Sequence, residues 1–243
     1  MKLEIIGFNL ASCLAAQQAG ADRIELCDNY HEGGTTPCYG AIRAAREKLS
    51  IELYVMIRPR GGEFLYSAEE YAMMKDDIRL CRQLNCDGVV LGMLQADGTV
   101  DQDRCARLVE EAYPLGVTFH RAFDGTCDPF RSLEDIIGSG CERILTSGLQ
   151  PTAAEGAGLI SQLVERAGDR ISIMPGSGVH AGNILDLAGK TGAVEFHSSA
   201  RQFVAGNMVY RNPALATEKS ILVDEAEVRA MRAALDSCSG IAK

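Results

Sequence analysis

The chain of 243 residues contains no tryptophan, and aromatic residues make up only 6% of it. No apolar run approaches the roughly 18 residues of a membrane-spanning helix, so we expect no membrane insertion. Acidic residues (33) outnumber basic residues (24), and the formal charge is −9. Because a nucleic-acid-binding face needs excess positive charge, this balance argues against nucleic acid as a partner.

The CxxC motif is also absent. None of the nine cysteines belongs to a CxxC pair, which removes the usual signature of a zinc ribbon or a thioredoxin-like site. A predicted strand begins at Leu3 and leaves no room for a signal peptide, so we expect a cytoplasmic protein. In that reducing compartment the cysteines should be free thiols.

One short sequence pattern occurs four times: a turn glycine or asparagine, a small residue and an acid, followed by an apolar run. The copies lie at 20–26, 85–91, 140–146 and, in a looser form, 192–197. Each copy follows a helical pattern and opens a strand pattern. The intervals hold one further strand and two helices, so we predict a single α/β domain, a (β/α)8 barrel of the TIM type.

The predicted domain spans residues 1–243, with a barrel core of about 3–200, an irregular segment over 201–223 and a last helix over 224–237. Helix starts are predicted at Asn9, at Asp101 and at two capping boxes, Ser67 with Glu70 and Thr152 with Glu155. The predicted strands are 3–7, 23–27, 53–58, 88–92, 117–120, 143–147, 171–174 and 193–197.

Alternation along these strands predicts which side chains face the barrel axis. Apolar residues such as Leu3, Ile5, Ile24 and Leu26 should face the helices, which turns their neighbours inward. The residues predicted to face inward are Glu4, Glu25, Cys27, Tyr54, Met56, Arg58, Thr118, His120, Glu195 and His197.

Three carboxylates therefore converge on three adjacent strands, at Glu4, Glu25 and Glu195. They cannot all stay ionised without a cation, a proton or a basic partner, for which Arg58 is the candidate. One interpretation is that Arg58 and the histidines only neutralise the glutamates. The other is that the polar groups at the carboxyl ends of the strands bind a ligand.

The loops after the last two strands resemble anion-binding loops. TIM barrels commonly hold phosphate there, on backbone N–H groups of glycine turns. The candidate residues are Gly176, Gly178, Ser198 and Ser199, and the arginines that could clamp an acid are Arg58, Arg60 and Arg121. Ordinary strand-to-helix turns remain the alternative.

Several of these motifs occur together, and in this order, in one known family. They are 23–27, 32–37, 57–62, 117–124, 145–148, 176–179 and 195–199. On these residues the chain resembles the copper homeostasis protein CutC family. The resemblance implies a TIM-type barrel, a cytoplasmic location and a role in copper tolerance or copper binding. It also implies a homodimer or homotetramer.

Three hypotheses for the site remain open. In the first, Cys27 and His120 bind copper(I), joined by Cys38 and Cys127 if these converge. In the second, the barrel is an enzyme that does acid–base chemistry on a small phosphorylated or carboxylated ligand. Its catalytic candidates are Glu25, Arg58, His120, Arg121, Asp124 and His197. In the third, a divalent metal is held by Glu4, Glu25, His120 and His197.

Overall fold

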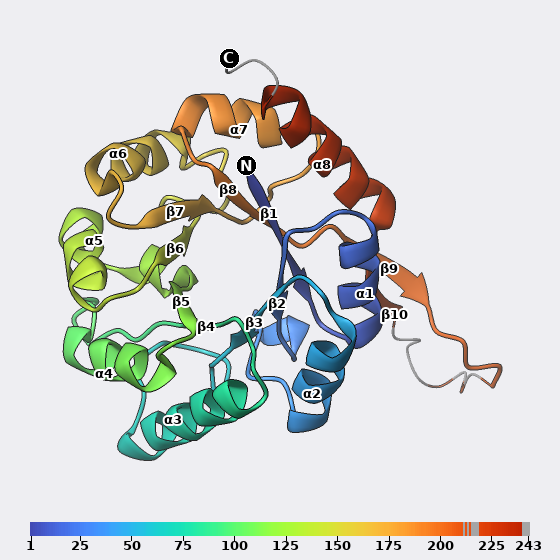
Figure 1. Cartoon of the computed structure of the whole chain (residues 1–243), viewed down its shortest axis with the longest axis horizontal. Coiled ribbons are helices and arrows are strands. Elements are labelled where there is room, and N and C mark those ends of the chain that lie inside the picture. The colour runs from blue at the N-terminus through green and yellow to red at the C-terminus, as the bar shows by residue number, and fades with distance from the viewer. Residues whose placement is uncertain (211, 213, 215–218, 240–243) are drawn as a thin grey trace.

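A computed structural model of the protein describes residues 1–210, 212, 214 and 219–239. Eight parallel strands form a ring, and helices surround it (Figure 1). The strands are β1 (Lys2–Gly7), β2 (Arg23–Leu26), β3 (Glu52–Met56), β4 (Gly88–Leu91), β5 (Gly116–Phe119), β6 (Arg143–Thr146), β7 (Ser172–Pro175) and β8 (Glu195–Ser198).

The helices alternate with the strands along the chain. They are α1 (Leu10–Gln18), α2 (Tyr39–Lys48), α3 (Ala68–Gln83), α4 (Gln102–Ala112), α5 (Pro129–Gly138), α6 (Ala157–Ala167), α7 (Ile184–Thr191) and α8 (Glu225–Ser239). Strands β1 to β7 pair in sequence order, β8 pairs with β1, and β7 lies against β8 at the seam. The predicted (β/α)8 barrel is confirmed. The four sequence repeats are the segments that enter β2, β4, β6 and β8.

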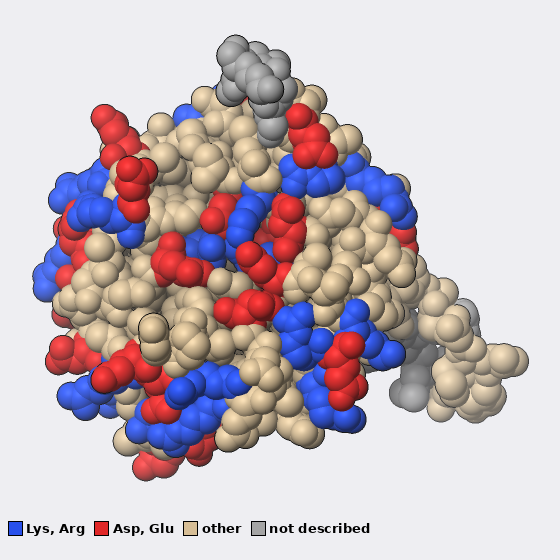
Figure 2. Space-filling view, viewed as in Figure 1, with Lys and Arg blue, Asp and Glu red and all other residues tan. Residues whose placement is uncertain are grey.

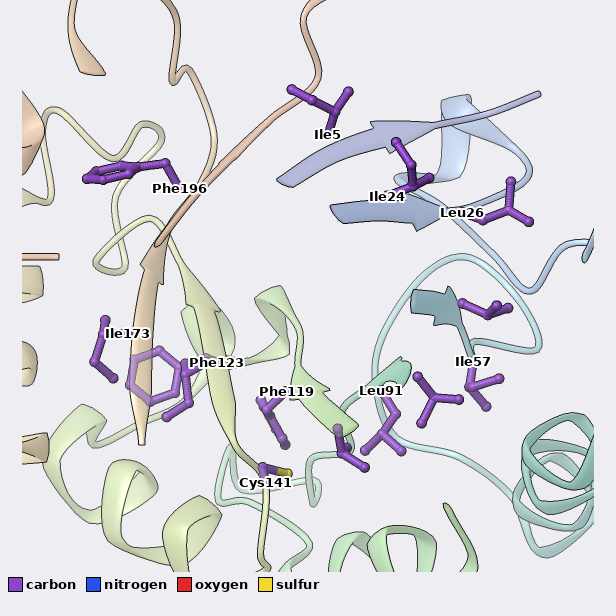
Figure 3. Packing of buried hydrophobic residues seen from close by; sticks show 14 of the residues in the cluster. Ile5, Ile24, Leu26, Ile57, Leu91, Phe119, Phe123, Cys141, Ile173 and Phe196 are labelled. Carbon is purple, nitrogen blue, oxygen red and sulfur yellow. The ribbon is translucent and has the colours of Figure 1, made fainter. Parts of the chain in front are cut away.

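The predicted alternation of side chains is also confirmed. Outward residues such as Ile5, Ile24 and Phe196 belong to the large apolar cluster between the strands and the helices (Figure 3). Cys27, Tyr54 and Met56 instead form a separate small cluster inside the barrel. A one-residue error in strand register would have exchanged these two sets.

Three of the four predicted helix starts cap their helices as expected. Asn9 accepts a hydrogen bond from the backbone of Ser12, Ser67 and Glu70 form a complete capping box, and Asp101 accepts from Arg104. Thr152 and Glu155 also exchange capping-box hydrogen bonds, at 3.1 and 3.3 Å. They close a turn that precedes α6, which begins only at Ala157.

The predicted irregular segment after the barrel was wrong in part. It contains two antiparallel strands, β9 (Arg201–Ala205) and β10 (Lys219–Val223), which project beside α1 (Figure 1). Asn9, which caps α1, donates to the carbonyl of Ile221 in β10, and Ser12 of α1 accepts from the backbone of Val223. Both strands are short and mostly exposed, so their sequences carry little alternation of polarity. Among the described residues, no helix is both long and apolar enough to cross a membrane.

Candidate functional site

The amino end of the barrel interior holds a closed network of ion pairs. Arg23 donates from Nε to Glu4 at 2.8 Å and also pairs with Glu195. Arg143 donates from Nε to Glu195 at 2.6 Å and from Nη1 to Thr118 at 3.0 Å. Acidic and basic side chains correspondingly gather at the centre of the ring in Figure 2. Each charge here has a partner, as burial requires.

This network corrects the expectation for Arg58, which contacts none of the three glutamates. Its guanidinium instead donates to the carbonyls of Glu32, Gly34 and Gly62, at 2.6 to 2.8 Å, and lies 5.0 Å from the centre of the Phe64 ring. Arg58 therefore ties together the two loops that follow β2 and β3. Glu4 and Glu195 are neutralised from the strand starts, by Arg23 and Arg143, and Glu25 is not.

Sequence reasoning missed Arg23 and Arg143, although the signal was present. Arg23 lies two residues before Glu25, and Arg143 lies beside the outward Ile144, so the same alternation rule turns both inward. Both residues stand at strand starts, next to the turn acids of the repeat.

The carboxyl end of the interior opens into a cavity of about 110 Å³. Its apolar lining includes Ile6, Met56, Phe64 and Leu145. Its polar lining consists of Glu25, Arg58, His120, Arg121 and His197. Five of the six predicted catalytic residues thus meet at one cavity.

Three polar atoms of this lining are buried and have no hydrogen-bond partner: Glu25 Oε1, Arg58 Nε and His120 Nε2. Buried polar atoms are normally satisfied, and each that is not costs about 1–3 kcal/mol. Arg58 lies beside the Tyr66 hydroxyl, so Glu25 Oε1 and His120 Nε2 are the atoms available to a ligand.

His197 connects the two ends of the barrel. Its Nδ1 lies 2.7 Å from Glu4 Oε1, and its Nε2 lies 3.8 Å from Glu25 Oε2. Burial alone would lower the pKa of His197, but the hydrogen bond to Glu4 and the charge of Glu25 outweigh it and raise that pKa. Burial likewise opposes ionisation of Glu4, yet His197 and Arg23 hold its pKa below the ordinary value. Glu4 therefore orients the His197 ring so that the Nε2 atom of His197 faces Glu25.

Glu25 is the carboxyl group that can change its charge near neutral pH. Burial raises its pKa to about 7, because the attraction of His197 offsets only part of that cost and the Glu4 charge adds to it. A group with such a pKa both accepts and donates protons at physiological pH.

Cys27 lies against Glu25 and is a poor thiolate. Burial, followed by the charges of Glu25 and Glu4, holds its pKa well above the ordinary value. The sulfur also packs against the backbone of Gly34, where an added Cβ would come within 3.2 Å. Cys27 is therefore a neutral thiol that fills the barrel beside the carboxyl group.

His120 is held as a neutral imidazole. Burial and the nearby Arg58 lower its pKa to about 3. Its Nδ1 accepts a hydrogen bond from the backbone of Ala122 at 3.2 Å, so the ring proton is on Nε2. Nε2 is the atom without a partner, and it offers a donor to the cavity. This tautomer does not offer Nε2 to a metal, which counts against the predicted role of His120 as a ligand.

Arg121 and Asp124 occupy different places in the site. Arg121 lines the cavity and is 44% exposed, with Nε bonded to Asp124 at 2.7 Å. Asp124 does not line it. Its carboxylate accepts hydrogen bonds from Arg121, Thr146, Ser147 and the backbone of Leu149, at 2.5 to 3.2 Å. Asp124 therefore positions Arg121 and the loop after β6.

An outer pocket of about 240 Å³ continues from the cavity and shares Ile6, Gly33, Arg121 and His197 with it. The predicted loop residues Gly178, Ser198 and Ser199 line it, together with Phe8, Tyr30, Ser177 and Arg201.

Not every predicted loop residue has a free group. Ser198 donates its hydroxyl to the carbonyl of Val179 at 2.6 Å, so it holds the two loops together. Gly176 packs closely against Leu145, whose side chain would have to move to admit a Cβ at position 176. Arg60 lies outside both pockets and bonds to Glu70 and to carbonyls of its own loop.

The possible metal ligands converge only in part. Within the described residues, one group of three could hold an ion: Glu4, Glu25 and His197, whose ligand atoms lie within 4.8 Å of one another. No cysteine belongs to it, and the predicted partners Cys38 and Cys127 are exposed. Two carboxylates and an imidazole suit a hard or borderline divalent ion, whereas copper(I) prefers sulfur. The residues present do not match a copper(I) centre.

The fold and the cavity define a TIM-barrel protein with a polar cavity at the carboxyl ends of the strands. The chain belongs to the CutC family, whose model matches residues 1–202, and this confirms the resemblance drawn from the motifs. A relative from Chromobacterium violaceum, named family protein CutC, is 52% identical over 242 residues, covering 96% of this chain and 98% of its own length. One from Parabacteroides distasonis is 50% identical over 226 residues, 93% of each chain.

Comparison with solved structures supports the same family and fold. The putative copper homeostasis protein CutC from Streptococcus agalactiae is 36% identical, with a TM-score of 0.79 over 82% of this chain and 98% of that one. Phosphoribosyl anthranilate isomerase from Thermotoga maritima is similar in fold alone, with a TM-score of 0.60 at 12% identity over 98% of this chain and 99% of that one.

Proposed function

We propose that this protein is an enzyme that transfers a proton to and from a small anionic molecule bound at the mouth of the barrel. One observation carries the proposal. Glu25, His120, Arg121 and His197 line one cavity, and two of them present buried polar atoms without a partner. A site that only stabilised the barrel would pair these atoms, as the amino end does.

Each residue has a distinct role in this reaction. Glu25 takes the proton from a C–H group and later returns it, because its pKa is about 7. The His120 Nε2–H donates to the substrate oxygen on which negative charge develops, and a neutral donor does not lose its proton to that oxygen. His197, oriented by Glu4, stabilises the ionised form of Glu25.

The anionic end of the substrate would lie in the outer pocket. Arg121 and Arg201 supply positive charge there, and the hydroxyl of Ser199 lies beside them. Phe8 and Tyr30 line the same pocket and limit it to a small molecule. A phosphate or carboxylate group fits this lining, because guanidinium groups bind both.

The test needs no knowledge of the product. The protein is screened by thermal shift against small phosphates and carboxylates, and each hit is incubated with it in deuterated water. We expect NMR to show deuterium entering one C–H position of a hit, and Glu25→Gln to abolish that exchange. The matched control Glu47→Gln changes an exposed glutamate of α2 and should keep it. Ligands that bind but never exchange would remove the enzymatic proposal.

Copper(I) binding at Cys27 is the second candidate, favoured by the name of the Streptococcus agalactiae relative and by a buried thiol that clusters with Met56 of the cavity lining. It requires a thiolate, which burial disfavours at this position. Anaerobic competition with a copper(I) chelator tests it. A stoichiometric complex that weakens on Cys27→Ser, but not on Cys105→Ser in α4, would support copper(I) binding there.

A divalent ion on Glu4, Glu25 and His197 is the related alternative. Metal analysis of protein purified without chelators distinguishes it, because a resident ion would be present in one equivalent. We further infer a single domain, a cytoplasmic location and a homodimer or homotetramer from the family. Light scattering coupled to size exclusion measures the oligomeric state.

A further inference from the structure

Two cysteines meet at the end of α3, far from the barrel mouth. The helix ends at Gln83, Leu84 is its C-cap, and Asn85 takes a left-handed conformation with φ of 55°. The backbone of Asn85 donates to Arg82, and that of Cys86 donates to Cys81, both at 3.0 Å. This double hydrogen bond is a Schellman motif, which brings the side chains of its first and last residues together.

The other copies of the internal repeat show which side chains meet at this position. In the first copy, the corresponding residues are Ala16 and Ala21, joined by the same backbone hydrogen bond at 3.0 Å. In the third copy they are Ile136 and Cys141. In Schellman motifs the two side chains at these positions usually make an apolar contact. The second copy instead places one thiol against another, at Cys81 and Cys86.

The two thiols differ in position and in charge. Cys81 is fully buried, whereas Cys86 is 4% exposed and contributes to the lining of a surface groove of about 760 Å³ together with Arg79 and Arg82. The hydrogen bond from Cys81 and the charge of Arg46 lower the pKa of Cys86 despite its burial. The thiol of Cys81 keeps its proton, because that hydrogen bond and burial raise its pKa. A thiol that accepts a hydrogen bond and lies near positive charge is the more reactive nucleophile of such a pair.

We propose that Cys81 and Cys86 form a redox-active pair that hydrogen peroxide or a related hydroperoxide converts to a disulfide. The Cys86 thiolate attacks a peroxide oxygen, so an S–O bond forms, the O–O bond breaks, and the released hydroxide becomes water. The Cys81 sulfur then attacks the sulfenic sulfur, so an S–S bond forms and a second water leaves with the Cys81 proton. The sulfurs lose two electrons in all, and the peroxide gains them.

The experiment uses the full chain and an internal control. The protein is exposed to graded hydrogen peroxide, remaining thiols are alkylated, and the protein is digested with trypsin. Cleavage after Arg79, Arg82 and Arg104 leaves the disulfide joining peptides 80–82 and 83–104. We expect this linked pair to form, to lose two hydrogen atoms relative to the separate peptides, and to disappear on reduction.

Cys141 occupies the same place in the repeat with Ile136 in place of a cysteine, so it is the matched control. We expect Cys86 to be oxidised at least about tenfold faster than Cys141. In Cys81→Ser, Cys86 should remain as a sulfenic acid that a 1,3-diketone reagent traps. Alkylation of both Cys81 and Cys86 at a dose that oxidises the exposed Cys38 would overturn the proposal. A disulfide from Cys86 to any other cysteine would overturn it equally.

Discussion

The two ends of the barrel interior contain the same kinds of side chain and use them differently. At the amino end, Arg23 and Arg143 satisfy Glu4 and Glu195 directly. At the carboxyl end, Glu25 and His120 keep polar atoms without a partner beside a cavity. Buried charge is therefore structural where it is paired. Where it is left unpaired next to an opening, it is available for chemistry.

The largest expected effect comes from breaking the paired end. Arg23→Met removes one partner from Glu4 and one from Glu195, which leaves the buried Glu4 with His197 alone and Glu195 with Arg143 alone. We expect it to lower the free energy of unfolding by about 3–5 kcal/mol, measured by urea denaturation. Arg43→Met, which removes an exposed pair with Glu47, is the control and should change little. An Arg23→Met protein as stable as the parent would show that the network is not structural.

The second prediction concerns Glu25 and pH. Its pKa is about 7 in the folded protein and near 4.5 when unfolded, so the folded state binds more protons between these values. Its contribution to stability is complete below pH 4.5 and is lost as pH rises through 7. Relative to Glu25→Gln, the parent should lose on the order of 2–3 kcal/mol between pH 4.5 and 8. Denaturation of both proteins across pH measures this, and parallel curves would contradict it.

His120 should show the opposite dependence. Its pKa is about 3 when folded and near 6.5 when unfolded, so below pH 6.5 the unfolded chain binds the additional proton. The stability that the neutral imidazole contributes is present above pH 6.5 and is lost as pH falls toward 3. Against His120→Asn, we expect a loss on the order of 2 kcal/mol between pH 6.5 and 4. A constant difference between the two proteins would mean that His120 is protonated in the fold.

The smallest expected effect is at the outer pocket. Arg121→Gln removes one guanidinium from its lining and should weaken an anionic ligand found by screening about tenfold, or about 1.4 kcal/mol. Isothermal titration measures the affinity. Arg60→Gln is the control, because Arg60 lies outside both pockets and should leave binding unchanged. Equal losses in both variants would indicate a general charge effect.

The sequence predicted the barrel and the inward glutamates because both depend on regular periodicity. The repeat that enters β2, β4, β6 and β8 fixes the number of units, and alternation alone places Glu4, Glu25, His120 and His197. The same rule would have placed Arg23 and Arg143.

The loops could not be predicted in the same way. Arg58 and Arg60 are separated by one proline, yet only Arg58 reaches the cavity. Their directions depend on the carbonyls that each loop presents, which no period in the sequence encodes. The pairing of β9 with β10 across a long connection was missed for a related reason, since no two-residue turn marks it.

The central claim is that Glu25 is a carboxyl group that exchanges its proton near neutral pH while Glu4 and Glu195 stay ionised. A carbon-13 NMR titration of the glutamate side chains, with Glu25→Gln used to assign the signal, measures this directly. The account predicts an apparent pKa near 7 for Glu25 and values below 4.5 for Glu4 and Glu195. A Glu25 signal that titrates near 4.5, like an exposed carboxylate, would contradict it.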